Sequence, residues 1–110
     1  MKKGVWLSFD LGVSGDYEGM YSWLDHHDAI ECGDSLAFLQ YEPKENLVEE
    51  IKRDIQNTVE LNEKKNRVYL IYRSEDLKMK GIFLFGSRKK APWTGYAPSE
   101  EVPTEDTSGQ

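Results

Sequence analysis

The fold begins with the stretch Val5-Trp6-Leu7-Ser8-Phe9-Asp10-Leu11, in which a row of four apolar side chains alternates with Trp6 and two polar residues. A repeat of two residues is the period of a β-strand that buries one face. Two glycines, Gly12 and Gly15, then favour a turn. The stretch therefore predicts a first strand over residues 5–11.

Two helices are predicted from apolar residues that recur every three or four positions. Asp16 is expected to be the N-cap of the first helix, whose apolar face repeats at positions 17, 20, 21 and 24. The second helix is predicted to run from Pro43, which suits a first helical turn, to about Asn62. Its apolar face repeats at every fourth residue, namely Leu47, Ile51, Ile55 and Val59.

Three more strands are predicted over residues 35–41, 68–72 and 82–85. The first of them is apolar in both alternating rows, which is typical of an interior strand. Turns are predicted at Gly33-Asp34 and over residues 74–78. The order strand, helix, strand, helix, strand, strand predicts an α+β domain over residues 1–96, in which two helices cover one face of a four-stranded sheet.

Large apolar side chains occur on both faces of the predicted strands. Trp6 lies on the other face of its strand from Leu7, and Phe83 lies on the other face of its strand from Ile82. Two helices cover only one face, and an uncovered apolar face on a small protein usually meets a partner. We therefore expect a homodimer. The alternative is that loops and the segment 91–96 fold over this face.

The last fourteen residues, 97–110, have the composition of a disordered acidic tail. They contain four acids, two prolines and a single large aliphatic side chain, Val102. Such a segment buries too little apolar surface to offset the entropy of ordering it.

A cytoplasmic location without membrane attachment is expected. Cys32 is the only cysteine, so an intrachain disulfide is excluded and a reducing compartment is favoured. No apolar run approaches the length of a transmembrane helix. The apolar run that follows Met1 is interrupted by Asp10 and two glycines, so we interpret it as a strand and not as a signal peptide.

The charge is divided along the chain. Residues 1–63 carry 14 acids and 5 Lys or Arg, a net −9, whereas residues 64–96 carry 2 acids and 9 Lys or Arg, a net +7. The basic part ends in a segment that combines cations with aromatic residues: Arg88, Lys89, Lys90, Trp93 and Tyr96. These five are the predicted binding residues, for a protein or a nucleic acid. The other interpretation is that Trp93 packs back on the sheet. Because the net −9 of residues 1–63 repels a long polyanion, we expect a protein partner rather than a nucleic acid.

Two short motifs are interpreted as structural. The glycine turn after Phe9-Asp10 is similar to phosphate-binding turns of much longer kinases and ATPases, and the chain is too short for that fold. The run Asp25-His26-His27-Asp28 is predicted to be the solvated end of the first helix. Neighbouring helical residues point about 100° apart and cannot all face one metal ion. We therefore predict no metal or other cofactor from these motifs.

Asp10 ends the first strand directly before the glycine turn. Here the chain resembles the small ferredoxin-like proteins that include the CRISPR-associated adaptation nucleases and the VapD-type toxins, in which an aspartate follows a hydrophobic first strand in a Tyr-Asp-x-Ser-like motif. Phe9-Asp10 matches this motif with Ser14 displaced, and the order of elements agrees over roughly the first 40 residues. The chain departs from the family in two ways. A helix follows the second predicted strand where a β-hairpin is expected, and the basic residues typical near that strand are missing.

The resemblance implies a ferredoxin-like α/β plait, which is the fold we expect. It also implies a metal-dependent nuclease in which the Asp10 side chains of a dimer hold Mg²⁺. The residues themselves present no nucleophile with a base and no paired carboxylates, and Asp10 can instead cap the turn. We therefore expect a non-catalytic interaction or regulatory module, antitoxin-like or immunity-like, rather than an enzyme. The nuclease is the alternative.

Overall fold

The computed structural model describes residues 1–98 and has an α+β fold. The predicted acidic tail therefore lies, from Ser99 onward, outside the described residues. In chain order the elements are β1 (Lys3–Asp10), α1 (Tyr17–His26), β2 (Ile30–Glu31), β3 (Leu36–Tyr41), α2 (Leu47–Thr58), β4 (Arg67–Arg73) and β5 (Met79–Phe85).

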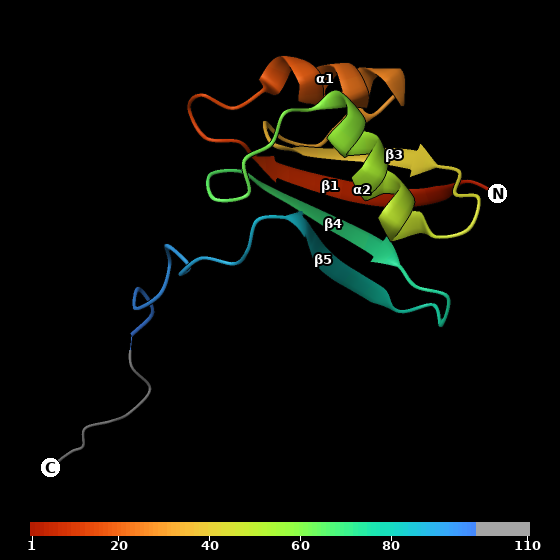
Figure 1. The fold of residues 1–110 in the computed structure, drawn as a ribbon. Coiled ribbons are helices and arrows are strands. Elements are labelled where there is room, and N and C mark those ends of the chain that lie inside the picture. Colours follow the sequence, from red (N-terminus) through yellow and green to blue (C-terminus); the bar gives the residue numbers. More distant parts are fainter. Residues whose placement is uncertain (99–110) are drawn as a thin grey trace, which may run out of the picture.

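The strands form one open antiparallel sheet in the order β2-β3-β1-β4-β5. The central strand β1 pairs with β3 on one side and with β4 on the other. Both helices lie on the same face of this sheet (Figure 1). We call the opposite face, which carries neither helix, the open face.

The core lies between the helices and the sheet. Along β1 the side chains of Val5, Leu7 and Phe9 are buried, whereas Trp6 between them is 37% exposed. The predicted alternation of the first strand is thus confirmed. The helices complete the core with Met20, Trp23 and Leu24 of α1 and with Ile51 and Ile55 of α2.

The sheet has five strands where the sequence predicted four. The additional strand, β2, has two residues and pairs with β3, and the turn between them contains Gly33 at a φ of 144°. Two residues are too few to show an alternating pattern, which explains why it was not predicted.

The second helix is shorter than predicted at both ends. Asn46 is its N-cap, because the Asn46 side chain accepts a hydrogen bond from the backbone N–H of Glu49. Pro43 therefore precedes the helix. The helix ends at Thr58, not near Asn62, because Val59 is extended. Val59 is nevertheless buried in the core, which is why it continued the apolar repeat.

Candidate functional site

The open face carries two pairs of aromatic side chains. Trp6 of β1 lies directly opposite Phe38 of β3, with ring centres 4.8 Å apart. Tyr69 of β4 lies opposite Phe83 of β5, with ring centres 4.7 Å apart in an edge-to-face arrangement. Each pair is a cross-strand pair, which fixes its position on the sheet.

Two glycines make room for these rings on the sheet surface. A Cβ atom at Gly4 would lie 2.9 Å from Cζ of Phe38, and one at Gly81 would collide with the hydroxyl and ring of Tyr69. Phe38 and Tyr69 therefore lie across glycines of the neighbouring strands. A larger side chain at either position would displace the aromatic ring from the sheet.

A groove of about 280 Å³ lies at one end of the open face, and we call it the arginine groove. It is lined by Ser8, Asp10, Arg67, Tyr69, Phe83 and Arg88. The guanidinium of Arg88 lies 5.4 Å from the ring centre of Phe83, within cation–π range. Nη2 of Arg67 donates a hydrogen bond to Oδ2 of Asp10 at 3.0 Å. This hydrogen bond is the main reason why the pKa of Asp10 lies below its usual value.

The five binding residues predicted from the sequence follow β5 in the segment 87–96, which leads away from the sheet (Figure 1). Arg88 reaches back into the arginine groove, and the positive charge of Lys89 also lowers the pKa of Asp10. Trp93 and Tyr96 are 73% and 85% exposed. The alternative in which residues 91–96 cover the sheet is therefore wrong, because these two rings face solvent.

Sequence reasoning missed Arg67 and Tyr69 as site residues. The signal was available, since both alternate with the buried Val68 and Leu70 and therefore share the other face of β4. Their neighbours on that face depend on strand pairing. The sequence does not show that β4 lies between β1 and β5.

The other end of the open face is apolar. A groove of about 650 Å³, called the apolar groove, is lined by the apolar side chains of Trp6, Phe38, Leu77 and Met79. The residues around them include the charged Lys2, Lys3, Arg73 and Glu75. Leu77 and Met79 are 74% and 54% exposed. Leu77 also has a φ of 64°, which is unusual for a leucine. An exposed leucine in a strained turn is not explained by packing within the chain.

The run Asp25-His26-His27-Asp28 ends α1, and Asp25, His26 and Asp28 are exposed there as predicted. The prediction is wrong for His27, whose side chain is only 20% exposed. Its Nε2 atom lies 3.1 Å from Oδ2 of Asp54 on α2, and its ring lies 4.4 Å from that of Trp23. The same Asp54 oxygen accepts a hydrogen bond from Nε1 of Trp23 at 3.1 Å. Burial and the nearby Asp54 charge raise the pKa of Tyr41 beside this cluster. The cluster joins the two helices, and its contacts are structural.

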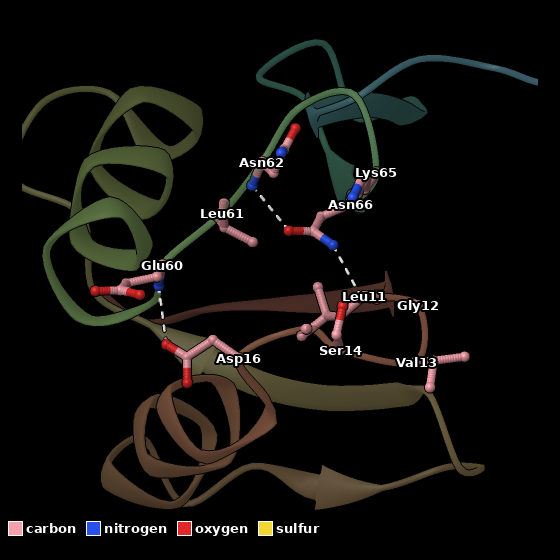
Figure 2. A pocket seen from close by; sticks show the side chains of 11 residues that line it. Leu11, Gly12, Val13, Ser14, Asp16, Glu60, Leu61, Asn62, Lys65 and Asn66 are labelled. Carbon is pink, nitrogen blue, oxygen red and sulfur yellow. Dashed lines mark hydrogen bonds between the residues drawn. The ribbon is translucent and has the colours of Figure 1, made fainter.

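A polar pocket of about 560 Å³ lies between the glycine turn and the loop after α2 (Figure 2). Its polar side chains bind the surrounding backbone. Asp16 accepts from the backbone N–H of Glu60, and Asn66 donates to the carbonyl of Leu11 and accepts from the N–H of Asn62. Asp16 also caps α1 through the N–H of Gly19, as predicted. These hydrogen bonds hold the two loops together, so we assign this pocket a structural role.

Metal binding can be tested against the side chains present. Within residues 1–98, no three His, Cys, Asp or Glu side chains are grouped so that they could hold a metal ion. Asp10 has Arg67 as its nearest partner, and a guanidinium competes with a cation for the carboxylate. One chain therefore supplies a single carboxylate, and a Mg²⁺ site would need a second Asp10 from another copy.

No helix in the described part of the chain is both long and apolar enough to cross a membrane. Comparison of the chain with protein-family models, with curated proteins and with solved structures finds no match.

Proposed function

We propose that the chain is a small, cytosolic, non-catalytic binding module that forms a homodimer and contacts a further partner on the open face. The observation that supports this is the pair of aromatic clusters on a sheet face that carries neither helix. Side chains of this size are seldom left on a surface without a binding role.

The two ends of the open face suit two different contacts. The apolar groove combines Trp6, Leu77 and Met79, and it is the end we assign to a second copy of the chain. Core patches of homodimer interfaces are more apolar than the remaining surface. The arginine groove is polar and charged, and it is left for another partner.

The arrangement of strands supports a ferredoxin-like plait as the parent fold. Without β5, the order β2-β3-β1-β4 with helices after β1 and β3 is the arrangement that the resemblance implies. The strands β2 and β3 also form a β-hairpin, which the resemblance leads one to expect and which the sequence pattern lacked. In this proposal β5 is an addition at the edge of the plait.

The same hairpin favours a second candidate, the metal-dependent nuclease. Asp10 lies at the end of β1 with its side chain 55% exposed, so two copies of it can approach one another. Against this candidate stands Arg67, which already pairs with the Asp10 carboxylate. We therefore retain the nuclease as the alternative.

Light scattering of the full chain tests the dimer. At micromolar concentration the mass should be about twice the chain mass of 12.7 kDa. A mass of one chain that persists at the highest soluble concentration would reject the homodimer.

A further inference from the structure

The open face of the sheet carries fewer charges than the two helices. The helices and their N-caps carry six acids and two cations, namely Asp16, Glu18, Asp25, Glu49, Glu50 and Asp54 together with Lys52 and Arg53. By strand register, the open face carries three charged side chains from β1, β3, β4 and β5: Asp10, Arg67 and Arg73. Asp10 is paired with Arg67, so the three charges leave a net positive charge on the open face, which favours an anion.

The arginine groove combines aromatic rings with guanidinium groups. Tyr69 and Phe83 are half-buried, so part of each ring remains exposed, and Arg88 lies over Phe83. Aromatic rings stack with nucleobases of any sequence, while Arg side chains bind phosphate. The volume of about 280 Å³ lies below the range of roughly 300–1,000 Å³ for a drug-sized ligand, so the groove holds only a small part of an oligonucleotide.

The binding surface continues along the segment 87–96. Lys89 and Lys90 follow Arg88 directly, and Trp93 and Tyr96 come next with their rings exposed. A hydrogen bond from the backbone N–H of Tyr96 to the carbonyl of Trp93 holds these two residues in one turn. Cations therefore precede a second pair of aromatic rings, at the end of β5 that borders the arginine groove.

We infer that the arginine groove and the segment 87–96 together bind single-stranded nucleic acid. This inference rests on the proposed use of the open face as a contact surface. One base stacks on Phe83 and meets the edge of Tyr69, because the planes of these two rings are 69° apart. Arg88 and the two lysines after it contact phosphates. Asp10 only accepts hydrogen bonds and is already paired with Arg67, so it makes no phosphate contact. A single strand is required because bases in a duplex are already stacked on one another.

Fluorescence anisotropy of the full-length chain with labelled 12-nucleotide RNA and DNA single strands, and with the matching duplexes, tests the inference. We expect both single strands, or one of them, to bind more tightly than its duplex. The logarithm of the affinity should fall with that of the salt concentration by a slope of about −0.7 per phosphate contact. Three phosphate contacts correspond to a slope of about −2.

Three substitutions locate the contact. Arg88→Gln should weaken binding and reduce the salt slope by about 0.7. The control is Arg53→Gln, which removes the same charge at an exposed position of α2 and should change neither the affinity nor the slope. Phe83→Leu keeps an apolar side chain but removes the stacking ring, and we expect an affinity at least about 5-fold lower. Thermal unfolding of each variant shows whether it is folded.

Four outcomes would overturn the inference. The first two are no anisotropy change with any single strand at low salt, and equal affinity for the single strands and the duplexes. The third is an equal loss of affinity in Arg88→Gln and Arg53→Gln. The fourth is equally tight binding of poly-glutamate, which would point to an acidic protein instead. Light scattering on the same samples separates the two proposals. A dimer that binds no oligonucleotide rejects this inference alone, and a monomer that binds one rejects only the proposed dimer.

Discussion

Asp10 and Arg67 are paired residues of β1 and β4, and Oδ2 of the aspartate lies 3.0 Å from Nη2 of the arginine. The other carboxylate oxygen accepts a hydrogen bond from the backbone N–H of Gly12 at 3.3 Å. Both oxygens of the residue that the nuclease hypothesis requires are therefore engaged within one chain. A metal ion would have to compete with the guanidinium of Arg67 for them.

The ion pair between Asp10 and Arg67 leads to a prediction about catalysis. With Mg²⁺ or Mn²⁺ present, the wild-type protein should leave single-stranded and duplex RNA and DNA intact, because one carboxylate held by an arginine is a poor metal site. Gel electrophoresis after prolonged incubation provides the measurement. Cleavage that disappears both in EDTA and in Asp10→Asn, but persists in Arg53→Gln, would establish the nuclease and reject the non-catalytic proposal.

Leu77 allows the proposed dimer surface to be tested without damage to the fold. Asparagine tolerates positive φ better than leucine and is polar. Leu77→Asn should therefore raise the dimer dissociation constant. At concentrations where both proteins are monomeric, it should leave the melting temperature equal or higher. Sedimentation or light scattering over a dilution series measures the first effect. The matched control is Val13→Asn, which removes a fully exposed apolar residue from the glycine turn. An equal effect of both substitutions would argue against the apolar groove.

Much of the fold could be predicted because its main elements carry regular patterns. The alternation of apolar residues in β1 and their repeat at every fourth position in α2 each indicate which side chains face the core. The misses have local causes. The strand β2 is too short for a pattern, and the start of α2 depends on a cap at Asn46, which the Pro43 signal obscured.

The candidate site was less accessible from the sequence because it depends on which strands are neighbours. Arg88 was predicted as a binding residue from its own cluster of cations, yet its partner Phe83 lies in a run read only as a strand. Tyr69 and Phe83 are fourteen positions apart and are partners in the regular register of the β4–β5 hairpin, which shifts only between Val68 and Tyr69. The contact between His27 and Asp54 depends on how α1 and α2 are placed, which residue spacing does not show.

Asp54 is predicted to stabilise the contact between the two helices. Asp54→Ala would leave Nε1 of the buried Trp23 without its acceptor and remove the partner of His27. The expected loss is about 1–2 kcal/mol in the free energy of unfolding, measured by urea denaturation. Asn57→Ala, an exposed substitution on the same helix, should cost clearly less. If the two variants lost the same stability, the contact would be without energetic importance.

The lowered pKa of Asp16 predicts how the stability of the fold depends on pH. Backbone hydrogen bonds from Glu60 and Gly19 lower the pKa of Asp16 below its ordinary value of 3.8. A folded-state pKa below the unfolded value means that the carboxylate stabilises the fold above about pH 4. This contribution is lost as the pH falls through the folded pKa. Asp16→Asn should therefore lower the melting temperature at pH 7, and the wild-type and variant curves should converge toward pH 2.

Asp16→Ser provides the control for this effect. Serine also caps helices but does not titrate in this range. It should therefore retain part of the capping contribution, and that part should not depend on pH. Melting temperatures by circular dichroism at pH 7, 5, 4, 3 and 2 give all three curves. A difference between wild type and Asp16→Asn that stays constant down to pH 2 would show that the charge of Asp16 is not what binds the two amides. The hydrogen bonds from Gly19 and Glu60 would then act as neutral contacts.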